Sequence, residues 1–146
     1  MTTANTSPIY TLTPNTFGGL VTAADAALGA GTSANDVLVY TAGTQGGFIQ
    51  QVIWTPYSTS GSVAGAACTG VIYLNNGSTP GTASNNVMIR QITLPATTVT
   101  QTATTAVPSY IMPLNFQVPA SYRLYAGVTA ITANGGWAVA VVCGSY

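Results

Sequence analysis

The chain has 146 residues, of which 47% are hydrophobic and 3% are charged, so it is long enough for one domain with a sizeable core. Its charged side chains are Asp25, Asp36, Arg90 and Arg123, and it contains no Lys, Glu or His. The lack of a basic cluster argues against a nucleic-acid partner, and no apolar run approaches the roughly 20 residues of a membrane span.

The composition also bears on assembly and compartment. A protein that works alone in the cytosol normally keeps its net charge away from zero, so a neutral, Thr-rich surface without Lys indicates that an assembly covers much of it. A neutral exported protein is the alternative. The opening MTTANTSPIYTLTPN has neither the charged nor the apolar region of a secretory signal, so we expect synthesis in a reducing cytosol. Cys68 and Cys143 are accordingly predicted to be buried thiols without a disulfide.

Residues 1–15 predict an extended N-terminal arm, followed by a single domain over residues 16–146. The segment is polar and Thr-rich, with a short strand signal at 9–12. A terminal segment of this kind is ordered only where something holds it, and a neighbouring chain is the expected support. The Gly- and Ala-rich run that follows is compatible with one helical turn at most.

From Asp36 onward, strand signals recur at intervals of about ten to twenty residues, which is typical of a sandwich. Loops are predicted at 58–64 and 78–85, and a Thr/Ala connector at 95–107. The strand candidates are 9–12, 37–41, 48–54, 67–74, 87–94, 110–118, 122–128 and 137–143.

The last three candidates have the clearest alternation. Pro113 predicts an edge position or a bulge in strand 110–118. Breaks are predicted after Val118 and at Asn134, where the residues that follow favour turns. Strand 137–143 has small or branched residues on both faces, so we expect the second sheet to cover one face and a neighbouring subunit or loop to cover the other.

These elements predict an all-β fold, an antiparallel eight-stranded sandwich that is jelly-roll-like, with an extended N-terminal arm. An immunoglobulin-like sandwich remains the alternative, because alternation does not reveal strand order.

No residue pattern predicts catalysis. General acid–base chemistry needs a titratable group near its task, and the only carboxylates, Asp25 and Asp36, lie in loop sequence typical of turn formers. A Ser or Cys nucleophile would lack its base, and there is no phosphate loop. We therefore expect no enzymatic activity, no cofactor and no metal site.

The remaining candidates are surface residues. Arg90 and Arg123 are predicted on outward strand faces, where they pair with the aspartates, pair with a neighbouring subunit, or stay exposed. The aromatic side chains of the strands are expected to be core or interface anchors, with a glycan-stacking platform as the alternative. The predicted assembly interface consists of Ile9, Tyr10, Leu12, Arg90, Arg123 and Tyr125.

Several segments resemble small β-sandwich structural proteins of tailed bacteriophages, of the capsid decoration or cement type. These segments are TANTSPIYTLTPN, VLVYTAG, VIYLNNGS, LPATT, PLNFQVPASYRLYAGV and GGWAVAV. The resemblance implies a virion protein on the capsid surface, made in the host cytoplasm, that stabilises the shell by bridging neighbouring subunits. Its implied partners are the major capsid protein and copies of itself, as a homotrimer.

Two other functions remain open at this point. One is a phage tail or fibre component that binds a cell-surface glycan, which would need an exposed aromatic and polar groove. The other is a subunit of a cellular surface fibre joined by strand donation, which would suit the arm but lacks an export signal.

Overall fold

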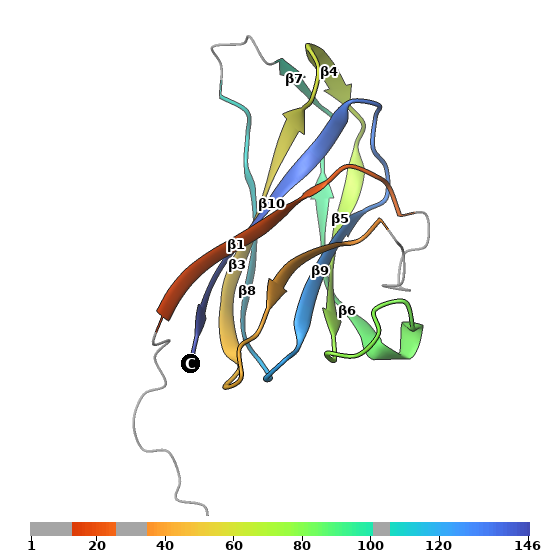
Figure 1. The fold of residues 1–146 in the computed structure, drawn as a ribbon. Coiled ribbons are helices and arrows are strands. Elements are labelled where there is room, and N and C mark those ends of the chain that lie inside the picture. The colour runs from red at the N-terminus through yellow and green to blue at the C-terminus, as the bar shows by residue number, and fades with distance from the viewer. Residues whose placement is uncertain (1–12, 26–34, 101–105) are drawn as a thin grey trace, which may run out of the picture.

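A computed structural model describes residues 13–25, 35–100 and 106–146 (Figure 1). Within these ranges the chain forms β-strands and one short 3-10 turn, and no helix there is long and apolar enough to cross a membrane. The elements are β1 (Thr13–Val21), β2 (Val37–Thr41), β3 (Gly47–Ser58), β4 (Ser62–Gly65), β5 (Cys68–Asn75), η1 (Ala83–Asn85), β6 (Asn86–Leu94), β7 (Thr97–Thr100), β8 (Tyr110–Val118), β9 (Arg123–Val128) and β10 (Gly135–Ser145).

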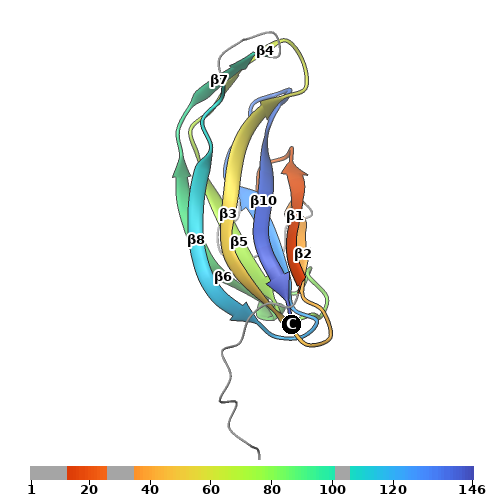
Figure 2. The same ribbon diagram turned by 90° about the vertical axis from the view of Figure 1, so that its left-hand side faces the viewer.

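Eight of the strands form two four-stranded antiparallel sheets that pack face to face, which confirms the predicted all-β sandwich (Figures 1 and 2). The first sheet has the order β1-β10-β3-β8 and the second the order β2-β9-β5-β6, while β4 and β7 form a separate pair at one end. The breaks after β8 and β9 lie where they were predicted. Because β8, β9 and β10 alternate between the two sheets, these connections cross from one layer to the other and do not join hydrogen-bonded neighbours.

Strand β8 shows how the sequence shapes an edge. It is the last strand of the first sheet, and its register against β3 shifts, since Ile49 pairs with Phe116 but Gln51 pairs with Pro113. The extra residue makes a bulge, and Asn115 within it has a φ of 52°. Pro113 has no N–H to donate, so the outer strand is the position that tolerates it. The edge and the bulge predicted from Pro113 are both confirmed.

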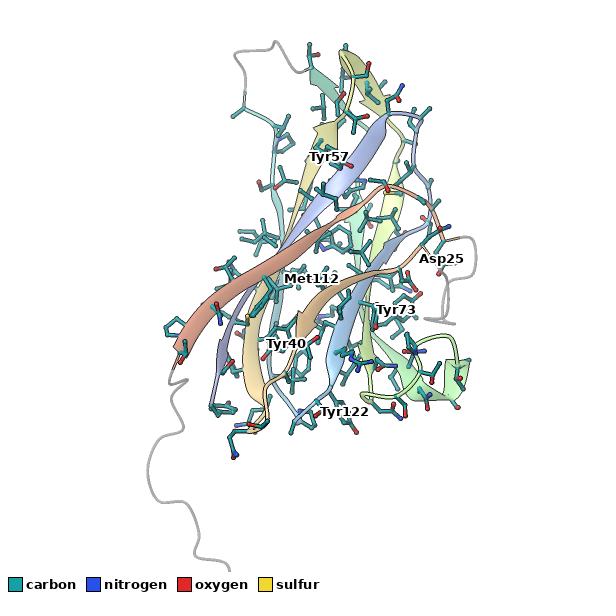
Figure 3. All side chains as sticks on the ribbon, viewed as in Figure 1. Asp25, Tyr40, Tyr57, Tyr73, Met112 and Tyr122 are labelled. Carbon is teal, nitrogen blue, oxygen red and sulfur yellow. The ribbon has the colours of Figure 1, made fainter. Side chains whose placement is uncertain are left out.

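The hydrophobic core lies between the two sheets and draws on both. Figure 3 shows Tyr40 of the second sheet and Met112 of the first in the interior. The two tryptophans are also core residues, because Trp54 is fully buried and Trp137 is 5% exposed. Tyr110 packs edge-on against Trp137 with 5.9 Å between ring centroids. The prediction that strand aromatics anchor the core is therefore confirmed for the two tryptophans, which cannot belong to a glycan-stacking platform on the surface.

The first strand differs from the prediction. Residues 1–12, including the candidate strand 9–12, lie outside the described residues, as does most of the Ala-rich run. Thr13, Pro14 and Asn15 were assigned to the arm, but they pair with Ser145, Gly144 and Cys143 of β10, so these three residues already belong to the sandwich. Strand β1 was missed because its glycines weaken the local signal, whereas β10 supplies a pairing partner along its whole length.

The pair β4 and β7 was also missed. Its strands lie inside the predicted loop 58–64 and the predicted connector 95–107, and they pair with Val63 opposite Val99. Each strand has only four residues, which is too short for alternation to stand out among Ser, Thr and Ala.

Candidate assembly surface

The outer face of the first sheet carries no charge. In β10, Trp137, Val139 and Val141 point into the core, so alternation places Ala138, Ala140 and Val142 outside. The same alternation and the strand registers define what we call the neutral face: Pro14, Thr16, Gly18 and Leu20 of β1, Ala138, Ala140, Val142 and Gly144 of β10, Phe48, Gln51, Ile53 and Thr55 of β3, and Ile111, Pro113 and Gln117 of β8.

The registers arrange the neutral face in four rows across the sheet. In strand order from β1 to β8, the rows are Leu20–Ala138–Thr55, Gly18–Ala140–Ile53–Ile111, Thr16–Val142–Gln51–Pro113 and Pro14–Gly144–Phe48–Gln117. The half on β1 and β10 consists mostly of small residues, and the half on β3 and β8 mostly of larger ones. A shallow hollow of about 460 Å³ lies at Gly144, between Pro14 and Thr16 on one side and Phe48 on the other.

The neutral face leaves large apolar side chains in solvent. Leu20 is 55% exposed and Ile111 is 56% exposed, on opposite edges of the sheet. Single exposed apolar residues are ordinary, but a contiguous face that is apolar and free of charge is typical of the centre of a protein interface. The prediction that a neighbouring subunit or loop covers the second side of β10 stays a prediction.

The outer face of the second sheet is different, because the chain itself covers much of it. Val71 and Tyr73 alternate with core residue Ile72, yet each is only 1% exposed. The Asp36 carboxylate lies against Gly127, where a Cβ atom would collide with it. The backbone N–H of Asp25 donates to the carbonyl of Val128 at 2.8 Å.

The predicted interface residues that the structure describes all lie on the second sheet. The Arg123 guanidinium donates to the Ser78 carbonyl at 3.4 Å, and half-buried Tyr125 stands opposite Tyr73 of β5. Ile9, Tyr10 and Leu12 fall outside the described ranges, so the prediction for these three residues stays a prediction. Arg90, Arg123 and Tyr125 do not belong to the neutral face.

Arg90 was expected on an outward strand face but lies at the open edge between β6 and β8. Arg90 keeps the alternation of Leu94 and Ile92, and it is paired with Ile72, which faces the core. It lines an apolar groove of about 300 Å³ together with Leu74, Ile89, Leu114 and Phe116. Alternation itself therefore places Arg90 on the core side of β6, and its side chain stays exposed because β6 is an edge strand.

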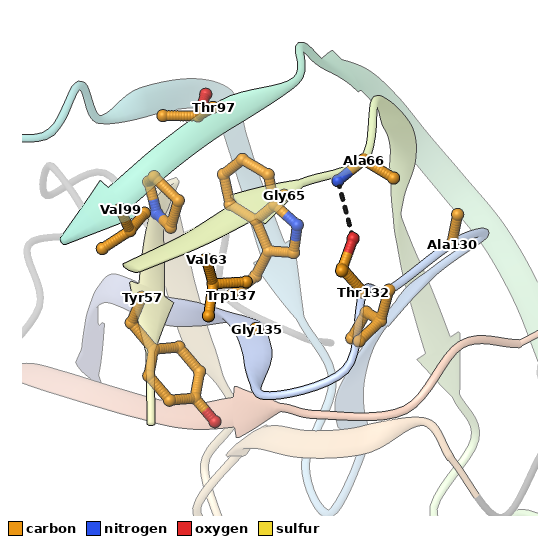
Figure 4. A pocket seen from close by; sticks show the side chains of 13 residues that line it. Tyr57, Val63, Gly65, Ala66, Thr97, Val99, Ala130, Thr132, Gly135 and Trp137 are labelled. Carbon is orange, nitrogen blue, oxygen red and sulfur yellow. Dashed lines mark hydrogen bonds between the residues drawn. The ribbon is translucent and has the colours of Figure 1, made fainter. Parts of the chain in front are cut away.

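A small pocket lies beneath the β4–β7 pair (Figure 4). Trp137, Val63 and Val99 line it, and the Ala66 N–H donates to the Thr132 hydroxyl at 3.1 Å. Its cavity volume is about 20 Å³, which is room for about one water molecule. This pocket is a gap in the packing and is too small for an organic substrate.

The two cysteines are buried and free, as predicted. Burial raises the pKa of both the Cys68 and the Cys143 thiol above the ordinary 9.0, which disfavours the nucleophilic thiolate. In the part of the chain that the structure describes, no three His, Cys, Asp or Glu side chains gather as metal ligands would.

Compared with known proteins, the chain matches no protein-family model, no curated protein and no solved structure. Function therefore has to be inferred from the residues of this chain, and the neutral face is the feature that most needs an explanation.

Proposed function

We propose that this chain is a non-enzymatic virion structural protein of a tailed phage, a capsid decoration subunit that stabilises the shell by bridging neighbouring subunits. It would sit on the capsid surface, with the major capsid protein as its partner, after synthesis in the host cytoplasm. The observation that carries the proposal is the neutral face, a whole sheet face without charge whose edges expose Leu20 and Ile111.

The chemistry of that face suits a contact with another subunit. Burial of apolar surface contributes roughly 25 cal/mol per Å², and no ion has to lose its hydration when such a face is covered. A protein that binds only the assembled shell stabilises it by RT ln(1 + [L]/Kd), which is about 2.7 kcal/mol when the free protein is at 100 times Kd. Because the contact is uncharged, its strength should change little with salt.

The strand order supports the jelly-roll form of the sandwich as part of this proposal. Consecutive strands β1, β2, β3 and β5 alternate between the two sheets, and β8, β9 and β10 do so again. An eight-stranded double sheet in which the chain crosses repeatedly between layers is the arrangement expected of a jelly roll.

The test compares particles that carry this protein with particles stripped of it. We expect stripped shells to rupture at a lower temperature, measured by light scattering on heating, and re-addition of the protein to restore the higher value at both low and high salt. Equal rupture temperatures for stripped and decorated shells would refute the decoration role. The alternative of a glycan-binding tail component lacks a specific supporting feature, because Trp54 and Trp137 are core residues.

A further inference from the structure

We propose that the neutral face pairs with the neutral face of a second copy of this chain, about a two-fold axis that runs parallel to the strands. The inference deepens the proposed function by naming a second copy of this chain as the neighbouring subunit that the neutral face contacts, so that the major capsid protein would be contacted by other surfaces. It rests on the proposed function only in treating the face as a contact surface. A two-fold contact uses the same patch on both copies, so the patch must complement itself.

The relief of the face meets that requirement. The half on β1 and β10 is low, with Gly18, Ala138, Ala140 and Gly144, and the half on β3 and β8 is high. A two-fold axis between β10 and β3 turns the second copy so that its high half lies over the low half of the first. Strand β1 then faces β8 of the second copy, and β10 faces β3.

The match holds in three of the four rows, whereas in the third row Val142 faces Gln51 and Thr16 faces Pro113, which are closer in size. Large residues oppose small ones in the facing pairs Gly18 with Ile111, Ala140 with Ile53, Ala138 with Thr55 and Gly144 with Phe48. Leu20 is the one large residue in the low half. In the second copy it faces the position that lies beside Thr55, one residue before β8 begins. Ser109 occupies that position, with its hydroxyl 2.9 Å from the Thr55 hydroxyl, so the one large residue of the low half also meets a small one.

The hollow at Gly144 is a second, independent observation. It lies at Gly144 between β1 and β3, with Pro14 and Thr16 on the β1 side and Phe48 and Gln50 of the same copy on the β3 side. The two-fold axis brings Phe48 of the second copy over this hollow. Aromatic side chains seated in preformed hollows are typical anchors of protein interfaces.

Size and charge favour a second copy as the occupant. Strands about 4.8 Å apart and rows about 6.8 Å apart give the face roughly 500 Å² a side, so the pair buries about 1,000 Å², near the lower limit for a specific interface. A reversible dimer is therefore expected. A charged partner would bury unpaired ions against this face, whereas a second copy brings none.

The experiment measures the mass of the full chain by sedimentation across a range of concentrations. We expect a monomer–dimer equilibrium whose dissociation constant is insensitive to salt. Ile111→Lys should weaken the dimer at least about tenfold, because it places a lysine in the contact of each copy. Val87→Lys is the matched control, since Val87 is 61% exposed on the edge strand of the other sheet, and it should leave the dissociation constant unchanged.

A volume swap tests the two-fold axis itself. Ala140→Ile alone should clash with Ile53 of the second copy, and Ile53→Ala alone should leave a gap opposite Ala140. The double variant exchanges the two side chains in both copies, so it should recover the dissociation constant of the natural chain to within about threefold. Circular dichroism and the melting temperature of each variant confirm that it is folded.

Each outcome decides the question. The two-fold contact is supported if the dimer is lost in Ile111→Lys, is kept in Val87→Lys and is recovered in the Ala140→Ile, Ile53→Ala double variant. A chain that stays monomeric, a trimeric mass as the phage resemblance implies, or a double variant as weak as the single ones would overturn it. Rupture temperature is measured separately on particles, so a dimer that adds nothing to shell stability would refute the decoration role and leave this inference standing.

Discussion

The outer faces of the two sheets differ in how far the chain itself covers them. On the second sheet, Val71 and Tyr73 are buried and the carboxylate of Asp36 packs on the backbone at Gly127. On the first sheet, Leu20 and Ile111 stand more than half exposed and no charge is present. All four charged residues of the chain belong to the second sheet or to segments packed against it, so the uncharged face reflects where the charges lie and not only how few there are.

The largest expected effect is a loss of stability, and it appears when two neighbouring residues of β3 that point to opposite sides of the sheet are truncated in turn. Trp54→Ala should lower the free energy of unfolding by about 3–5 kcal/mol, because it empties a fully buried site between the sheets. Ile53→Ala, on the neutral face, should lower it by less than about 1 kcal/mol in dilute protein. Urea denaturation measures both, and equal losses would mean that the neutral face is already part of a core.

The next largest effect comes from adding a small side-chain group to each of the two outer faces. Gly127→Ala should destabilise the fold by about 1–3 kcal/mol, because the new Cβ displaces the buried oxygen of Asp36. Ala138→Val adds more volume on the neutral face and should change stability by less than about 0.5 kcal/mol. Melting temperatures of the two variants at low protein concentration provide the comparison. An unchanged melting temperature in Gly127→Ala would show that the packing of Asp36 against Gly127 does not contribute to the stability of the second sheet.

Two N-terminal truncations test where the assembly arm ends and the first strand of the neutral face begins. Removing residues 2–12 should leave the melting temperature of the sandwich unchanged and weaken incorporation into particles, as predicted for an assembly arm. Removing residues 2–15 also deletes Thr13 to Asn15, which pair with β10, and should lower stability by about a further 1–2 kcal/mol. If the shorter deletion prevents folding or leaves incorporation normal, the assembly-arm prediction is wrong.

The smallest expected effect is a decline in stability at high pH, which comes from the one buried cysteine that each sheet contains. Cys143 lies in the first sheet and Cys68 in the second, and burial raises the pKa of both thiols above 9.0. The folded chain then keeps these protons where the unfolded chain loses them, so stability should be complete below pH 9 and decline as pH rises beyond it. Urea midpoints at pH 8 and pH 10 measure the decline, which should be shallower in the Cys68→Ala, Cys143→Ala double variant.

The sequence was most informative where alternation was long. Strands 37–41 and 110–118 have the predicted bounds, and Pro113 correctly indicated an edge and a bulge. Strand β1 could not be predicted, because Gly18 and Gly19 carry no pattern and the strand depends on β10, which is more than a hundred residues away in the chain. Long-range pairing of this kind leaves no local signal.

The candidate surface was predicted only in part. The small residues on both faces of strand 137–143 led us to expect that its second side is covered, which stays a prediction. Alternation within one strand does not show which strands lie beside it. The neutral face depends on the order β1-β10-β3-β8, which brings Leu20 and Ile111 to opposite edges of the same sheet. Charge and aromatic content instead pointed to Arg123 and Tyr125, which lie on the other sheet.

The bulge in β8 has a consequence for how crowded copies of this chain meet. An exposed strand edge invites another edge to add to it, and many proteins prevent this with lysine, which this chain lacks. In β8 the imino ring of Pro113 removes a donor and the positive φ of Asn115 bends the backbone, so an incoming strand finds no continuous ladder. Sheet growth into insoluble aggregates is thereby obstructed at this edge without any charge, while the broad surface beside it stays free for contact.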